Sequence, residues 1–330
     1  MTPFKTLSKC LKFGAVTLAA ATGFASISSA QEILKFGHVY ESATPYHQAA
    51  LRAADAFKAA TNGAYEIQVF PASQLGNESA LNEALVLGTV DIIYTGPAFM
   101  ALSYPPISIS DYPFTMRGYD HWKAYVNSDL FGELAQNYTD VTGNTVAAMT
   151  YYGARHVTAN KPILTPADMK GLKIRTPNAP AYQMFRKITG ANPTPMAFSE
   201  VYLALQQKVV DAQENPLPTI QFKKFYEVQS NINLTGHILN SLGLLISQQT
   251  MNKLGDDAPK LQQALKDAAA WCSEEIYTSE GNLVEWFRDQ GVTVNDVDRG
   301  PFIDAVAPAL TGSDMPWEPS VYERLKAIKG

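Results

Sequence analysis

The sequence has 330 residues, of which 46% are hydrophobic and 17% are charged. The length corresponds to about two domains at roughly 150 residues each, and the composition excludes a disordered or fibrous chain. Residues 1–30 hold three lysines and no acid, so the remaining chain has 23 basic and 31 acidic residues, a net charge of −8. Because nucleic-acid binders are normally basic, nucleic acid is not an expected partner.

The first thirty residues have the plan of a secretory signal peptide. Three lysines precede an apolar run at 13–24, and small residues stand before a cut after Ala30. We therefore expect residues 1–30 to be a signal peptide, Gln31 to begin the mature chain, and the protein to be periplasmic. The alternative is a short membrane anchor, but a span needs about 20 apolar residues, and this run is shorter.

The chain holds two cysteines, Cys10 and Cys272. Cys10 would leave with the signal peptide, and the one remaining cysteine makes no internal disulfide. A mature chain of this length is long enough to be held by an ordinary hydrophobic core. Cys272 lies in the apolar stripe of a helical segment, which favours buried packing over a nucleophilic role.

Strand-like and helix-like segments alternate along most of the chain, the pattern of an α/β fold. In the first half, we expect strands at 33–39, 65–70 and 90–95 and helices at 45–60 and 78–87. After Thr150, we expect strands at 172–175 and 210–214 and helices at 179–188 and 198–207. The Pro-rich stretch 104–113 predicts an irregular surface segment. The pattern as a whole predicts two α/β lobes, each with a mostly parallel sheet.

The chain is expected to cross between these lobes twice. An extended run that begins at Thr145 is interrupted at Gly153, which places one crossing near Tyr152. The apolar run 238–247 is typical of a strand that returns to the first sheet. The predicted first lobe is therefore residues 31–152 plus 241–280, and the predicted second lobe is 153–240 plus 281–330.

A long helix is predicted near the end of the chain. From a cap at Asp257, with Pro259 in the first turn, apolar residues keep helical spacing as far as Phe287. Some thirty residues at 1.5 Å each give a length of about 50 Å. A domain of 150 residues has a radius of gyration of only about 15 Å, so the helix is expected to span both lobes. The alternative is two helices broken at Gly281.

The common motifs of catalysis are missing from the sequence. There is no Gly-x-Ser-x-Gly, His-Glu-x-x-His or Gly-x-Gly-x-x-Gly, and no phosphate loop that ends in Gly-Lys-Ser/Thr. None of the five histidines stands at metal-ligand spacing from a second His or Cys. Nothing therefore nominates a metal or a cofactor.

Three polar residues follow or end predicted strands in apolar surroundings. Arg155 follows the run 145–152, Arg175 ends the strand LKIR, and Asn215 ends the strand VVDAQEN before a proline. Ligands of open α/β sheets lie beyond the carboxyl ends of strands, and a guanidinium matches a carboxylate with a planar fork of donors. A carboxylate site is one interpretation. Salt bridges for the arginines and a helix cap for Asn215 are the alternatives.

Six segments resemble, in order and spacing, those of the extracytoplasmic solute receptors of TRAP transporters, the DctP-like periplasmic binding proteins. They are LKFGHV at 34–39, FPASQLGNE at 70–78, YYGARHVTANKPI at 151–163, PADMKGLKIRTPNAPAY at 166–182, NPTPMAFSEVYLALQQKVVDAQENPL at 192–217 and HILN at 237–240. The resemblance covers essentially all of residues 31–330. It implies a two-lobed, type II-like α/β binding protein with a hinge and a long helix across both lobes. Such a receptor closes around an organic acid and hands it to the TRAP membrane permease subunits.

The resemblance also implies roles for residues of the second lobe. Arg175 is expected to bind the ligand carboxylate, Arg155 to assist and Asn215 to complete the anchor. Phe198 is expected to form an aromatic wall against the ligand.

The first lobe is expected to supply selectivity through Gln74, Glu78, Tyr94 and Tyr151. A further likeness to the sialic-acid-binding branch lies in PTPMAFSEVYLALQ and QENPL. The sequence departs from that branch at HVY (38–40) and DIIYTGPAF (91–99), where the branch has polar and charged contacts. A smaller or less hydroxylated acid is therefore expected. C4-dicarboxylates, hydroxy or oxo acids, sugar acids and aromatic acids all stay open, as does the oligomeric state.

Two other classes of function compete with this interpretation. A periplasmic lyase or hydrolase could use the same arginine anchor, but it would need a general base near the ligand, for which Glu78, His38 and Glu214 are the nominations. A purely structural protein would bind no small molecule.

Overall fold

The computed structural model describes Met1 and residues 31–330. The predicted signal peptide, with Cys10, lies outside the described residues apart from Met1. The strands are β1 (Glu32–Gly37), β2 (Tyr65–Phe70), β3 (Ile92–Thr95), β4 (Thr145–Ala159), β5 (Lys173–Thr176), β6 (Asn192–Pro195), β7 (Ala212–Pro216), β8 (Asn231–Ile246) and β9 (Thr293–Asn295).

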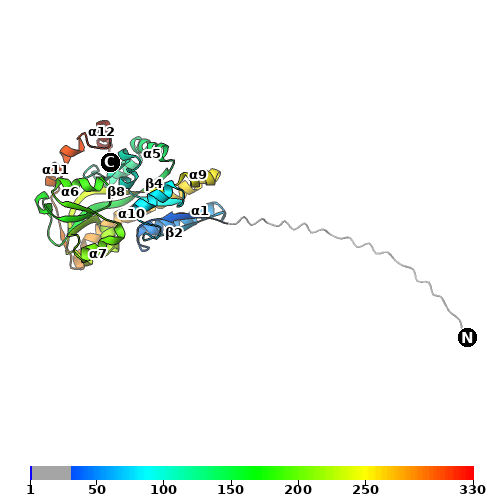
Figure 1. Cartoon of the computed structure of the whole chain (residues 1–330), viewed down its shortest axis with the longest axis horizontal. Coiled ribbons are helices and arrows are strands. Elements are labelled where there is room, and N and C mark those ends of the chain that lie inside the picture. Colours follow the sequence, from blue (N-terminus) through cyan, green and yellow to red (C-terminus); the bar gives the residue numbers. More distant parts are fainter. Residues whose placement is uncertain (2–30) are drawn as a thin grey trace. The chain divides into compact units, whose positions relative to one another are not determined.

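The α-helices and one long 3₁₀-helix alternate with these strands (Figure 1). They are α1 (Pro45–Ala60), α2 (Glu78–Val86), α3 (Pro97–Met100), η1 (Pro105–Asp111), α4 (Tyr119–Val126), α5 (Asp129–Thr142), α6 (Ala181–Ile188), α7 (Val201–Gln206), α8 (Leu217–Phe222), α9 (Gln248–Leu254), α10 (Ala258–Asp289), α11 (Gly300–Leu310) and α12 (Pro319–Ala327).

The strands of the described residues form one nine-stranded sheet in the order β2-β1-β3-β8-β4-β7-β5-β6, with β9 also paired to β8. The β1–β2, β1–β3, β5–β6 and β5–β7 pairs are parallel. Two long strands, β4 and β8, pair antiparallel along most of their length and join the two ends of the sheet. The expectation of two mostly parallel sheets is thus wrong in one respect, because β4 and β8 continue through both.

The predicted interruption at Gly153 is a β-bulge inside β4. The pairing of β4 with β8 slips between Tyr151 and Gly153, and Gly153 has a φ of 115°. A side chain there would meet Glu280 Oε1 at 2.6 Å and Pro216 Cβ at 2.7 Å. Glycine fits because it lacks a Cβ and tolerates positive φ. The strand therefore bends without ending, and Arg155 lies within it.

The Pro-rich stretch 104–113 also differs from its prediction. Residues 105–111 form η1, and Ile107 through Asp111 are buried. Two prolines begin this 3₁₀-helix, and its apolar residues pack beneath β8 instead of facing solvent.

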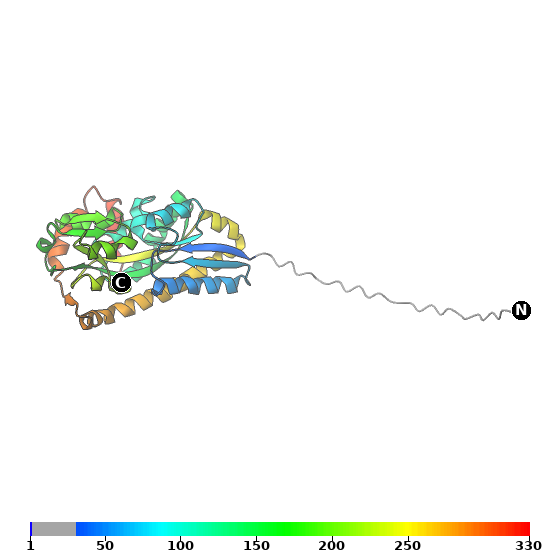
Figure 2. The same cartoon turned by 60° about the horizontal axis from the view of Figure 1, so that its bottom comes forward.

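The predicted long helix is confirmed as the unbroken 32-residue α10, which passes through Gly281. The helix starts as predicted, with Asp257 at the N-cap position and Pro259 in the first turn, but the Asp257 side chain pairs with Lys260 at 2.7 Å and makes no capping hydrogen bond. Figure 2 shows α10, in orange, on the same face of the sheet as α1, in blue. The helix also contacts α8 and β9 from the other end of the sheet. Its buried stripe includes Leu261, Cys272 and Phe287.

The described structure therefore confirms the α/β class and the long helix. The exact division into residues 31–152 plus 241–280 and 153–240 plus 281–330 stays a prediction. Within the described residues, no helix is both long and apolar enough to cross a membrane.

Candidate ligand-binding site

Side chains from both ends of the sheet converge on one small cavity. Its volume is about 20 Å³, and it lies where β4, β5 and β7 meet residues from the region of β1, α2 and α3. A second cavity of about 160 Å³ adjoins it and shares Glu78, Phe99 and Arg175. The first cavity is lined by Tyr40, Glu78, Gly96, Phe99, Tyr152, Arg155, Arg175, Pro177, Tyr182, Phe198, Asn215, Asn240 and Leu242.

A larger hollow of about 570 Å³ lies elsewhere, among α4, α5, β4 and α10. It contains none of the predicted site residues. We place the candidate site at the smaller cavity because polar groups converge there and five of the predicted site residues line it.

Arg175 is a buried cation at the cavity wall. It comes from β5 and its side chain is buried. Its Nε and Nη2 donate to the carbonyl oxygen of Met196 at 3.2 and 2.9 Å. Within the described part of the chain, Arg175 makes no ion pair, and its guanidinium lies 5.9 Å from the Phe198 ring centroid. Burial lowers its pKa to about 10, so it is a cation at neutral pH.

Arg155, by contrast, is fully engaged by protein groups. Its Nε contacts Glu214 Oε2, its Nη2 donates to Glu214 Oε1 at 2.8 Å, and its Nη1 donates to Asn240 Oδ1 at 2.8 Å. Glu214 also pairs with Arg186 Nη2 at 2.6 Å. Burial alone would raise the pKa of Glu214, but the two arginines hold it well below its usual range. This ion cluster shapes the cavity wall.

Two asparagines lie beside this cluster with their carboxamides hydrogen bonded. Asn215 Oδ1 accepts from Arg155 Nη2 at 3.2 Å and from the Tyr152 hydroxyl at 3.3 Å. Asn240 Nδ2 donates to Asp111 Oδ1 at 2.6 Å. Burial raises the pKa of Asp111 to about 6. These bonds connect the cavity wall to η1.

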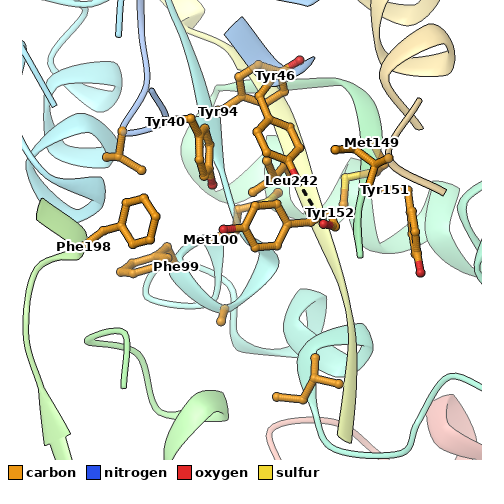
Figure 3. Close-up of a cluster of buried hydrophobic side chains, with 14 of the residues drawn as sticks. Tyr40, Tyr46, Tyr94, Phe99, Met100, Met149, Tyr151, Tyr152, Phe198 and Leu242 are labelled. Atoms are coloured by element: carbon orange, nitrogen blue, oxygen red, sulfur yellow. Dashed lines mark hydrogen bonds between the residues drawn. The ribbon is translucent and has the colours of Figure 1, made fainter. Parts of the chain in front are cut away.

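Aromatic rings form the apolar walls. The Tyr40 centroid lies 5.6 Å from that of Tyr152 and 6.2 Å from that of Phe198. The close-up in Figure 3 shows Tyr40, Phe99, Tyr152 and Phe198 gathered around one space. Such rings offer flat apolar surfaces, and the tyrosines add hydroxyls that hydrogen bond to polar groups.

Glu78 is the one carboxylate among the lining residues. It begins α2, and the neighbouring Asn77 caps that helix by accepting from Ala80 N at 3.0 Å. Burial raises the pKa of Glu78, and the charges of Arg175 and Arg155 offset part of that rise. Glu78 and Arg175 line the same cavity without forming an ion pair, and the charge of Glu78 offsets part of the lowering that burial causes in the pKa of Arg175.

The structure brings five of the eight predicted residues to the cavity, namely Arg155, Arg175, Phe198, Asn215 and Glu78. It places the other three elsewhere. Gln74 is exposed in the loop before α2. Tyr94 packs behind Tyr40, with ring centroids 6.3 Å apart.

Tyr151 points to the opposite side of β4 from Tyr152 (Figure 3), and its hydroxyl donates to Glu280 Oε2 at 2.9 Å. Successive side chains of a strand alternate between its faces, so only one tyrosine of this pair can enter the cavity. The alternation was available from the sequence, but which of the two enters depends on the bend at Gly153.

Sequence reasoning missed Tyr40, Tyr182 and Asn240. Tyr182 donates to Asp111 Oδ2 at 3.1 Å, and its hydroxyl also contacts Asn240 Oδ1 at 3.3 Å. Tyr182 and Asn240 stand in segments that carried the family resemblance, PADMKGLKIRTPNAPAY and HILN. Tyr40 follows β1, and its position after a strand was the available signal.

Of the three general bases nominated for an enzyme, Glu78 lines the cavity, whereas His38 and Glu214 have other surroundings. His38 is buried, its Nδ1 accepts from Tyr40 N at 3.2 Å, and burial lowers its pKa to about 3. Glu214 is occupied by two arginines. No group of three or more His, Cys, Asp or Glu in residues 31–330 could hold a metal ion. The arrangement is suited to hold an anion among aromatic walls.

Known proteins are similar to this chain in both sequence and fold. The chain is 36% identical to the sialic acid-binding periplasmic protein SiaP of Vibrio cholerae, over 98% of this chain and 100% of that protein. It is 31% identical to the 2,3-diketo-L-gulonate-binding periplasmic protein YiaO of Escherichia coli, over 95% of this chain and 96% of that protein.

A solved TRAP periplasmic solute-binding protein from Polaromonas sp. JS666, bound to D-erythronate, has a TM-score of 0.87 at 33% identity, over 91% of this chain and 100% of that one. Another from Roseobacter denitrificans, with bound L-galactonate, has a TM-score of 0.84 at 31% identity, over 90% of this chain and 99% of that one. These relatives are solute receptors of the two-lobed type, and none of their names describes an enzyme. The model of the bacterial extracellular solute-binding proteins, family 7 (DctP), matches residues 36–313, and the chain belongs to that family of transport receptors.

Proposed function

We propose that this receptor binds a small monocarboxylic hydroxy acid through Arg175. The observation that carries the proposal is a buried arginine at a cavity wall with no ion pair in the described residues. A buried cation without a partner is costly, and a ligand carboxylate would remove that cost. The guanidinium fork suits a carboxylate because it can donate two parallel hydrogen bonds.

The remaining walls favour a compact ligand with hydroxyl groups. Phe99 and Phe198 offer apolar faces, while Tyr40, Tyr152 and Asn215 carry polar groups at the same cavity. The relatives bound to D-erythronate and L-galactonate carry acids of this class. The departure from the sialic-acid-binding branch at residues 38–40 and 91–99 supports a short acid over a nine-carbon sugar acid.

We infer that the ligand is enclosed between two lobes that close on it. Contacts join segments assigned to different predicted lobes: Lys223 Nζ pairs with Glu41 Oε1 at 2.6 Å, and Tyr182 bonds to Asp111. An acid that touches both sides stabilises the closed state by its differential affinity. The closed receptor would then deliver the acid to a TRAP membrane permease, after export of the chain to the periplasm through the signal peptide 1–30.

The test is a thermal-shift screen followed by calorimetry with D-erythronate, L-galactonate, 2,3-diketo-L-gulonate, succinate and N-acetylneuraminate. A ligand at 100 times its dissociation constant adds about 2.7 kcal/mol of stability, so a true ligand gives a clear shift. We expect a short hydroxy acid to bind most tightly. Tightest binding of N-acetylneuraminate, or no binding by any carboxylate, would contradict the proposal.

A further inference from the structure

A row of four buried polar side chains, joined by hydrogen bonds, leads away from the cavity. It begins at Asn215, passes through Gln213 and Thr158, and ends at Gln229, all four of which are buried. Asn215 and Gln213 lie on β7, two residues apart, and Thr158 faces them from β4. Only Asn215 lines the cavity.

The donor and the acceptor of each hydrogen bond in this row follow from its last member, Gln229. Gln229 Nε2 lies 3.1 Å from the carbonyl oxygen of Val228 and 3.4 Å from that of Asp211, and carbonyl oxygens only accept. The amide oxygen of Gln229 must therefore face Thr158. The Thr158 hydroxyl donates to it at 3.1 Å.

The hydrogen bonds between Thr158 and the cavity run in the same direction. Having donated its hydrogen, the Thr158 hydroxyl can only accept, and Gln213 Nε2 donates to it at 3.0 Å. Gln213 Oε1 is then left to accept from Asn215 Nδ2, at 2.6 Å. Asn215 Oδ1 consequently faces Arg155.

The contact between Arg155 and Asn215 requires the same orientation of the Asn215 amide, independently of Gln229. Arg155 has only donors, and its Nη2 lies 3.2 Å from Asn215 Oδ1. A donor-only group at one end and acceptor-only carbonyls at the other permit one polarity. Flipping any single amide would set donor against donor, or acceptor against acceptor, in a buried site.

We propose that Gln213 is a positioning residue that holds the Asn215 carboxamide with its oxygen on Arg155 and its second N–H available to the ligand. Among the hydrogen bonds of the described residues, Asn215 Nδ2 donates to Gln213 alone, so one of its two hydrogens is free for a ligand acceptor. This inference rests on the proposed function, because it assigns Asn215 to ligand binding. Gln213 would then influence recognition through Asn215, although it does not itself line the cavity.

The test is a double-mutant cycle measured by calorimetry with D-erythronate and L-galactonate. A neutral hydrogen bond contributes about 0.5–1.5 kcal/mol, so Gln213→Met should weaken binding by roughly 2- to 12-fold. Asn215→Ala should weaken it by about 10-fold or more. In the Asn215→Ala background, adding Gln213→Met should change the affinity by less than about 2-fold, because the group that it positions is gone.

A merely structural role predicts a different outcome, in which Gln213→Met weakens binding equally in both backgrounds. That result overturns the proposal, as does an unchanged affinity in the Gln213→Met single variant. Thr61→Val, which removes a buried hydroxyl bonded to the Phe57 carbonyl in α1, is the control for general destabilisation and should leave the affinity unchanged.

A second readout needs no ligand. The side-chain NH₂ resonances of Asn215 should shift in Thr158→Val, although Thr158 does not touch Asn215 directly, and should stay in place in Thr61→Val. If the Asn215 resonances do not shift in Thr158→Val, the proposed positioning of Asn215 through Gln213 is refuted. If neither acid binds the wild-type protein while this shift is present, the proposed ligand class fails and the positioning role of Gln213 stands.

Discussion

Substitution by methionine should destabilise the fold at Arg155 but not at Arg175. Arg155→Met removes one of two arginines that neutralise buried Glu214. Breaking a buried ion pair costs about 3–5 kcal/mol, so this variant should lose that much unfolding free energy. Arg175→Met removes a buried cation that makes no ion pair with the described residues, at the cost of two hydrogen bonds to Met196. Its unfolding free energy should stay within about 1 kcal/mol of wild type.

Ligand affinity, unlike stability, should fall strongly when Arg175 is replaced. Two charge-assisted hydrogen bonds from Arg175 to a carboxylate contribute about 1.5–3 kcal/mol each, and each 1.4 kcal/mol is a factor of ten. Arg175→Met should therefore weaken binding by at least about 100-fold. Arg175→Lys should recover only part of the loss, because an ammonium lacks the planar fork.

The assays are urea unfolding without added acid and calorimetry with D-erythronate or L-galactonate. Arg288→Met is the matched control, since Arg288 is exposed and, within residues 31–330, pairs only with Glu285 on the same helix; neither quantity should change there. Near-normal affinity in Arg175→Met would refute the anchor. Loss of several kcal/mol of stability in that variant would show that Arg175 is structural instead.

Three further predictions concern the bulge of β4 and closure of the receptor. Burial raises the pKa of Glu280 to about 7 from an ordinary 4.5, so its protonated form stabilises the fold below pH 4.5 and this contribution is lost as the pH rises through 7. Wild type should therefore lose about 2.5 kcal/mol of unfolding free energy relative to Glu280→Gln between pH 5 and pH 8. The same difference in unfolding free energy between the two proteins at both pH values, measured by urea unfolding, would contradict this. Gly153→Ala should destabilise by about 1–3 kcal/mol because its φ is positive and the new Cβ meets Pro216, whereas Gly281→Ala, in open space on α10, should stabilise by about 0.5–1 kcal/mol; equal denaturation midpoints for the two variants would exclude this account of the bulge. In solution scattering, the radius of gyration should fall when a binding acid is added, and an unchanged value at saturation would exclude hinge closure.

Much of the fold could be predicted because local segments carry their own signals. Helix α1 and strand β2 have the predicted bounds, and α10 is unbroken across Gly281. These elements depend on side chains two to four positions apart, which the sequence displays directly. The continuation of β4 and β8 through both halves of the sheet was not visible, because strand pairing joins residues that are far apart in the chain.

The sequence by itself determined the residue types of the site, and the family resemblance indicated their positions. Only the tertiary structure decided which arginine is neutralised: Glu214 lies 59 positions from Arg155 and reaches it only because β4 pairs with β7. It likewise decided that Tyr152 enters the cavity and Tyr151 does not. Charge balance and side-chain direction depend on what surrounds a residue in space, and those neighbours come from strands and loops whose pairing no local pattern specifies.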